Sequence, residues 1–185
     1  NTVKCSAFFG RKPHLPCVKF KFYFVMRLIY LFPAAVLLFG CNTGGNHAEF
    51  EANKAIAMAA FAAHENEDLE GWAQHFSDDL KHESPVYGAG TITMEQHREQ
   101  VTAYHEHFDH IKFTEGVWLA GVDGKTNEFD GSVRCNGTWT SVHGGSSTEI
   151  SLRSYHFFNF ENGKIVHSGD FFDFGGMMAA IPPPQ

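Results

Sequence analysis

The sequence lacks the paired cysteines of a disulfide framework. Of its 4 cysteines, Cys5 and Cys17 precede Met26, Cys41 ends an apolar segment, and only Cys135 lies in the remaining chain. A single cysteine can form neither an internal disulfide nor a metal site of the multi-cysteine kind. Because Cys135 lies in a strand-like run, we expect it to be a small core residue rather than a nucleophile.

The sequence also has no long hydrophobic run and few basic residues after position 41. Its longest apolar run, Leu28–Phe39, has twelve residues, which is too short for an ordinary transmembrane helix. After position 41 there are 8 basic and 21 acidic residues, a net charge of −13 with neutral histidines. Such a charge repels nucleic acids and anionic membrane surfaces, so we expect no nucleic-acid partner.

The apolar run follows a Met-Arg pair and ends in the sequence LFGC, with Cys41 as its last residue. This segment resembles the lipobox signal of bacterial lipoproteins. The resemblance implies a signal peptide over residues 26–41, lipidation of Cys41, a tether over 42–47 and a place in the bacterial cell envelope, with membrane contact only through the lipid. Residues 1–25 are expected to be over-extended translation. An uncleaved anchor and a buried segment are the alternatives.

Hydrophobic periodicity predicts one domain over residues 48–181, followed by a disordered tail over 182–185. Helical spacing comes first, and a Thr-x-x-Gln capping box at Thr93 opens the last helix. Long stretches of period-two alternation follow, separated by Gly-rich or polar turns. Helices followed by a meander of antiparallel strands indicate an α+β fold with helices on one face of a curved sheet. The expected helices cover 48–65, 69–76 and 94–108, and the expected strands cover 112–122, 129–143, 148–160 and 164–174.

The Asn162-Gly163 pair lies between two alternating aromatic runs, SYHFFNF and IVHSGDFFDF. This pattern predicts a two-residue hairpin, which sets the register of both strands. With Glu161 opposite Lys164, an acid, a phenol, a guanidinium and several aromatic rings share one face. The facing pairs are then Tyr155 with Asp170, Arg153 with Phe172, and Phe157 with Ser168. We expect the functional surface there.

Two stretches resemble the nuclear transport factor 2-like superfamily and, within it, the SnoaL-like group. They are FAAHENEDLEGWAQHFSDDLKHESP, residues 61–85, and GKIVHSGDFFDFGGMMAAI near the end. The resemblance implies a cone of three N-terminal helices packed on a strongly curved, mainly antiparallel sheet, with a pocket inside. Members include steroid isomerases, polyketide cyclases, limonene-epoxide hydrolases and non-catalytic binding or assembly domains, so the fold alone does not define an activity.

Matching the resemblance residue by residue narrows the chemistry. Ser84 stands where ketosteroid isomerases have their aspartate base, the stretch Ala60-Phe61 lies where they have a tyrosine, and Arg153 stands where they have a protonated aspartate. That reaction is therefore not expected. Asp170 matches the last-strand aspartate of the cyclases and epoxide hydrolases, although the hydrolases' R-x-D motif is missing. The resemblance thus implies an acid–base role for Asp170.

The residues themselves support the same candidate. Burial among aromatic side chains raises the pKa of a carboxyl group and a nearby arginine lowers it, and perturbed acids in clefts are functional candidates. We predict Asp170 and Tyr155 as catalytic residues, with His82 or His97 as a proton acceptor. The alternatives are a structural Asp–Arg–Tyr network and hydrogen-bonded core histidines. The predicted ligand contacts are Arg153, Phe157, Phe172, Ser168, Ser84, Trp139 and Tyr104.

No cofactor or metal is expected. The histidine-rich segment 105–110 has only His107 and His110 at helical spacing, and no motif supplies further ligands. We expect Asp173 to cap the Gly175-Gly176 turn. The predicted function is capture of a small apolar or aromatic molecule, with or without cofactor-free catalysis. The alternative is an assembly domain with a vestigial pocket. A homodimer through the sheet is expected in both cases.

Overall fold

The computed structural model describes residues 45–183. The predicted signal segment and Cys41 therefore lie outside the described residues. None of the described helices is both long enough and apolar enough to cross a membrane. The elements, in chain order, are α2 (Gly45–Glu65), α3 (Leu69–Ala73), β1 (Phe76–Glu83), β2 (Thr91–Thr93), α4 (Met94–His107), β3 (Phe108–Val122), β4 (Phe129–His143), β5 (Thr148–Glu161), β6 (Lys164–Phe171) and α5 (Phe174–Ala180).

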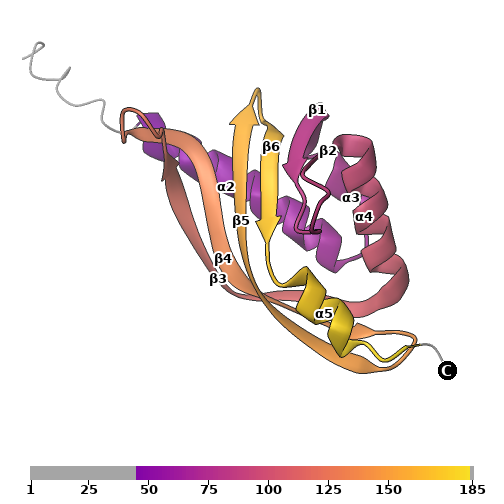
Figure 1. Ribbon diagram of the computed structural model, residues 1–185. Coiled ribbons are helices and arrows are strands. Elements are labelled where there is room, and N and C mark those ends of the chain that lie inside the picture. The colour runs from indigo at the N-terminus through magenta and orange to yellow at the C-terminus, as the bar shows by residue number, and fades with distance from the viewer. Residues whose placement is uncertain (1–44, 184–185) are drawn as a thin grey trace, which may run out of the picture. The chain divides into compact units, whose positions relative to one another are not determined.

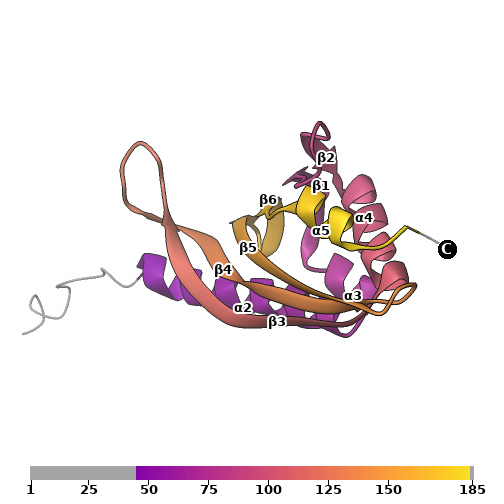
Figure 2. The same cartoon turned by 60° about the horizontal axis from the view of Figure 1, so that its bottom comes forward.

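The six strands form one curved sheet in the order β2-β1-β6-β5-β4-β3. All neighbouring strands are antiparallel except β1 and β6, which are parallel. In Figure 1 the long strands β3, β4 and β5 bend along their length, and Figure 2 shows α2 lying along β3 and β4. The predicted fold class, α+β with helices packed on a curved and mainly antiparallel sheet, is confirmed.

The main core lies between α2 and the inner face of the sheet. Ala57 and Ala60 of α2 and Trp72 of α3 are buried there. The small side chains of the two alanines let α2 approach the strands closely. The inner face contributes Val133 and Ile165, both with no exposed surface. A second hydrophobic cluster lies near the start of β5. Its buried residues are Phe108, Ile111, Ile150 and Met177.

Short-range capping signals set several element ends. Thr93 and Gln96 form the predicted capping box at the start of α4. The Asp173 side chain accepts a hydrogen bond from the Gly176 N–H at 2.8 Å, which confirms the predicted cap. That cap begins the short helix α5, so β6 ends at Phe171 rather than at residue 174. α2 starts at Gly45 and so includes the last residues of the expected tether.

The β5–β6 hairpin has the predicted turn but not the predicted register. Asn162 and Gly163 have φ values of 51° and 73°, as such a turn requires, and Glu161 faces Lys164. Beyond the turn, Phe160 pairs with Ile165 but Asn159 pairs with His167, so Val166 is an extra residue. A bulge of this kind shifts all later pairs by one. Asp170 consequently faces His156, not Tyr155.

Candidate functional site

A cavity lies between the helices and the inner face of the sheet. It offers about 110 Å³ to the centres of water-sized molecules, many times the roughly 10–15 Å³ that one water needs on this measure. Most of its lining is apolar or aromatic, and no lysine or arginine is among the lining residues. The polar lining groups are His64, His82, His97, Tyr104, Trp139, Thr140, Ser141, His156, Ser168 and Asp170.

Among the described residues that line the cavity, Asp170 is the only acidic one, and β5 holds its carboxylate in place. Its Oδ1 lies 2.7 Å from Nδ1 of His156, the residue directly opposite on β5. The other ring nitrogen of His156, Nε2, accepts a hydrogen bond from the Trp139 indole N–H at 3.0 Å. An indole N–H only donates, so His156 Nε2 carries no proton in this arrangement and Nδ1–H donates to Asp170.

The second oxygen of Asp170 faces His82 and the cavity. His82 Nε2 lies 3.6 Å from Asp170 Oδ2, and the Asp170 side chain is 24 % exposed. His82 is held by Ser168, its cross-strand neighbour, with 2.9 Å between Nδ1 and Oγ. Its ring stacks on that of His97 with 3.6 Å between centroids. His82 Nε2 is buried and makes no hydrogen bond, so it is free to exchange a proton with Asp170.

Burial and neighbouring groups set the charges in the cavity. Burial opposes ionisation of Asp170, but the imidazoles of His156 and His82 and the hydrogen bond from His156 outweigh it, so the pKa of Asp170 lies below its ordinary value. Burial, and next the neighbouring His82, lowers the pKa of His97 to about 3. Burial also lowers the pKa of His82. At neutral pH an ionised Asp170 therefore faces the neutral imidazoles of His82 and His97.

Tyr104 and His64 complete the polar part of the wall. Burial, and next the charge of Asp170, raises the pKa of Tyr104 above its ordinary value, so its hydroxyl remains a donor. Burial, and next His105, lowers the pKa of His64 to about 3. Nδ1 of His64 lies 2.8 Å from Nε2 of His105. These groups offer a ligand hydrogen bonds but no positive charge.

The structure brings together seven of the predicted site residues. Asp170, Ser168 and Phe172 line the cavity from the end of the chain, as predicted. The rest of this group comes from α4, β1 and β4. They are His82, His97, Tyr104 and Trp139. Their chemical roles stay predictions, because the structure settles only where they lie.

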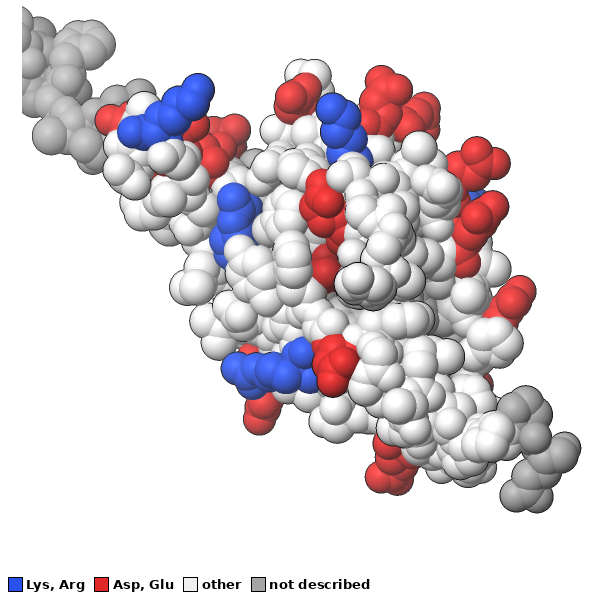
Figure 3. Space-filling model, viewed as in Figure 1, with Lys and Arg blue, Asp and Glu red and all other residues white. Residues whose placement is uncertain are grey.

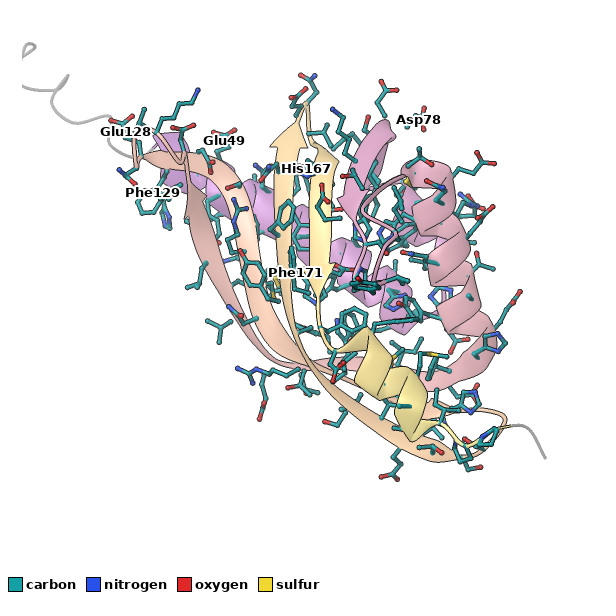
Figure 4. The ribbon with its side chains drawn as sticks, viewed as in Figure 1. Glu49, Asp78, Glu128, Phe129, His167 and Phe171 are labelled. Atoms are coloured by element: carbon teal, nitrogen blue, oxygen red, sulfur yellow. The ribbon has the colours of Figure 1, made fainter. Side chains whose placement is uncertain are left out.

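Arg153, Tyr155 and Phe157 are not in the cavity, so the predicted shared face with Asp170 is wrong. These residues of β5 lie on the outer face, opposite to the buried even-numbered residues of the strand, and the bulge at Val166 turns Asp170 to the inner face. Arg153 is 68 % exposed there and lies 3.5 Å from Glu115. Tyr155 and Phe157 instead contact Phe171 of β6. Figure 4 labels Phe171 and His167, two residues of β6 whose rings contact Phe157 on the outer face.

Ser84 is also outside the cavity lining. β1 ends at Glu83, and the Ser84 hydroxyl accepts a hydrogen bond from the Gln100 side chain at 2.9 Å. Sequence reasoning missed His156 and His64. His156 could have been found, because it shares strand parity with Phe158 and Phe160, the apolar residues expected to face a core.

The histidine-rich segment 105–110 does not form one continuous helical face in the structure. Within residues 45–183, no group of three or more His, Cys, Asp or Glu side chains is arranged to hold a metal ion. His107 and His110 do not share a helical face, since α4 ends at His107 and His110 lies in β3 with φ of 57°.

The fold and cavity define an α+β cone with a single acidic residue in an apolar pocket. The chain belongs to the SnoaL-like domain family, whose model matches residues 57–168. The predicted superfamily and group are thereby confirmed. No curated protein matches the chain.

Solved structures share the fold at low sequence identity. A protein from Xanthomonas campestris, provisionally classed as a polyketide cyclase, is 11 % identical with a TM-score of 0.60, covering 72 % of this chain and 99 % of its own. A provisionally classed isomerase from Bacillus subtilis is 13 % identical with a TM-score of 0.61, covering 72 % and 96 %. A protein from Catenulispora acidiphila with a ketosteroid isomerase-like fold, solved with trimethylamine, is 17 % identical with a TM-score of 0.53, covering 68 % and 90 %. At these identities the likeness concerns the fold alone.

Proposed function

We propose that the domain binds a small, largely apolar molecule in its cavity and that Asp170 exchanges a proton with it, without a cofactor. The observation that carries this proposal is the state of the Asp170 carboxylate. One oxygen is fixed by His156, and the other is open to an apolar cavity. A carboxylate fixed in this way can act as a base through its position, within reach of a ligand proton, although its lowered pKa makes it weaker than a carboxylate in water.

The roles of the neighbouring side chains follow from their free atoms. His156 has both ring nitrogens engaged, so it is a positioning residue for Asp170. His82 has an unpartnered Nε2 near Oδ2 and can take the proton from Asp170 and return it. Tyr104 stays protonated and can donate a hydrogen bond to a ligand oxygen. A proton removed from one atom of the ligand and returned to another gives a balanced isomerisation or cyclisation.

The test uses 2-tetralone, a ketone with exchangeable α-protons, as a probe in D₂O. Proton NMR follows deuterium incorporation in the presence of the wild type, Asp170→Asn and the control Asp123→Asn. Asp123 lies between β3 and β4 and is outside the cavity lining. General-base catalysis is worth about 10²–10⁴-fold, so exchange should fall at least tenfold in Asp170→Asn and stay unchanged in the control. Equal rates in all three proteins contradict a catalytic Asp170.

A second role is favoured by the outer face of the sheet. Val117, Leu119 and Phe171 are each about half exposed, at 50 %, 49 % and 53 %. Apolar surface of this kind often forms interfaces, and the proposed role is a homodimer through the sheet. Sedimentation velocity of the wild type and of Leu119→Lys tests it. A wild type that sediments as a monomer at micromolar concentration contradicts the dimer.

The location of the protein in the cell envelope also remains a proposal. It is supported by the LFGC sequence that ends at Cys41. Expression in a bacterium with radiolabelled palmitate should label the wild type but not Cys41→Ser. Label in neither protein contradicts the lipid anchor.

A further inference from the structure

Asp170 brings a negative charge into the cavity that no cationic side chain of the lining balances. The lining contains no lysine or arginine, and the arginine that the sequence placed beside Asp170 lies on the outer face, near Glu115. A buried ionised group without a counter-charge is energetically costly. The imidazoles of His156 and His82 stabilise the ionised form of Asp170, but neither is a permanent cation, so a cationic group on a ligand would supply the full counter-charge.

The titratable groups that face Asp170 do not supply it. His82 from β1 and His97 from α4 are 1 % and 6 % exposed, and burial favours their neutral forms. His64 from α2 is held neutral in the same way. His156 from β5 has Nε2 against the Trp139 N–H and the Ser154 hydroxyl, and it is not a permanent cation. Tyr104 from α4 is neutral when protonated.

The other cavity-lining residues suit a ligand that carries a cationic group on an apolar ring system. The faces of aromatic rings attract cations, and eight Phe, Tyr or Trp residues line the cavity. They are Phe61, Trp72, Phe76, Tyr104, Phe108, Trp139, Phe158 and Phe172. The chain after residue 41 has 8 basic and 21 acidic residues. The face of the molecule seen in Figure 3 carries acidic side chains at several places and basic side chains at few. Such a surface attracts cations at long range.

We infer that the cavity selects small ring-containing amines, with the ammonium group at Asp170 Oδ2 and the ring against the aromatic wall. This inference rests on the proposed function, since it names the ligand class of the same site. An anionic ligand is excluded by the same charge. A neutral ketone or alcohol fits the cavity but leaves Asp170 without a counter-charge.

The test compares three shape-matched probes: 2-aminotetralin, 2-tetralol and tetralin-2-carboxylate. Calorimetric titration of the full chain at pH 7 should show the amine binding at least tenfold more tightly than the alcohol, and the carboxylate at least tenfold more weakly. In Asp170→Asn, with its fold checked by circular dichroism, the ratio of amine to alcohol affinity should fall to about one. The same ratio in Asp123→Asn should match the wild type.

The outcomes separate the two proposals. If the alcohol and 2-tetralone bind but the amine has no advantage in the wild type, the amine inference is wrong and the proposed function stands. If the carboxylate binds most tightly, the inference is wrong as well. If none of the probes binds, the cavity is not a binding site for such molecules and both proposals fail. The comparison among wild-type affinities does not depend on whether the variant folds.

Discussion

Replacing His97 with phenylalanine should make the protein less sensitive to acid. His97 is 6 % exposed and its ring stacks on that of His82. Its ring centroid lies 4.9 Å from that of Trp72. Burial lowers its pKa from 6.5 to about 3. The unfolded chain therefore takes up a proton at this residue below pH 6.5, whereas the folded chain does so only near pH 3. A state that binds more protons gains stability as the pH falls, and here that state is the unfolded one.

The size of the effect follows from this difference. Each pH unit below 6.5 costs the folded state about 1.4 kcal/mol through this one residue. Between pH 6.5 and pH 4 the loss reaches about 3 kcal/mol, a large part of a typical stability of about 5–15 kcal/mol. Above about pH 6.5, His97 adds little to the pH dependence of the free energy of unfolding. His97→Phe keeps an aromatic ring in the stack and removes the proton site, so the variant should lose this part of the slope.

Urea unfolding, followed by tryptophan fluorescence at half-unit steps from pH 8 to pH 4, measures the effect. The free energy of unfolding of His97→Phe should fall about 3 kcal/mol less than that of the wild type over this range. His107→Gln is the matched control, because His107 lies at the exposed end of α4, and its curve should follow the wild type. Parallel curves for the wild type and His97→Phe would refute the argument that His97 is buried and neutral.

Three further perturbations test other parts of the structure. Trp139→Phe keeps an aromatic ring but removes one of the two hydrogen-bond partners of His156 Nε2, the other being the Ser154 hydroxyl, so it should cost about 1–2 kcal/mol in chemical unfolding and slow the exchange of 2-tetralone; an unchanged exchange rate contradicts the positioning role of His156. A Cβ at Gly169 meets Phe157 Cε1 at 2.3 Å, so Gly169→Ala should cost about 1–3 kcal/mol, and an unchanged melting temperature contradicts this close approach. Cys135 has no exposed surface and burial raises its pKa to about 12; iodoacetamide should therefore modify its peptide, as measured by mass spectrometry, only after denaturation, and labelling of the native protein contradicts this burial.

Features that depend on neighbouring residues could be predicted from the sequence. The turn at Asn162-Gly163 needs two residues that accept positive φ, and the cap at Thr93 needs a glutamine three positions later. The Asp173 cap similarly depends on the glycines that follow it. Each of these signals is complete within a few residues, so packing elsewhere in the chain did not alter them. The strands β4 and β5 were placed for the same reason, from their own alternation.

The register beyond the hairpin could not be predicted in this way. A regular strand cannot turn both Ile165 and Ser168 to the same face, because they are three residues apart. The core needs Ile165, which is fully buried in the main core cluster, and the cavity needs Ser168 and Asp170. The extra residue Val166 satisfies both requirements. Such a need arises only in the assembled sheet, although the apolar residues at even positions of β5, such as Phe158 and Phe160, did indicate its inner face.

The bulge at Val166 also decides the charge of the site. In a regular register Asp170 would lie opposite Tyr155 on the outer face, near Arg153, where a cation would balance it and water would screen it. In the observed register it faces His156 within an apolar cavity that no cationic side chain lines. The same carboxylate therefore changes from half of a surface ion pair to a charge that has only imidazoles as ionisable partners and is available to a ligand. The expected binding of amines depends on this single inserted residue, and it reverses the preference for anions or carbonyl oxygens that Arg153 would have produced.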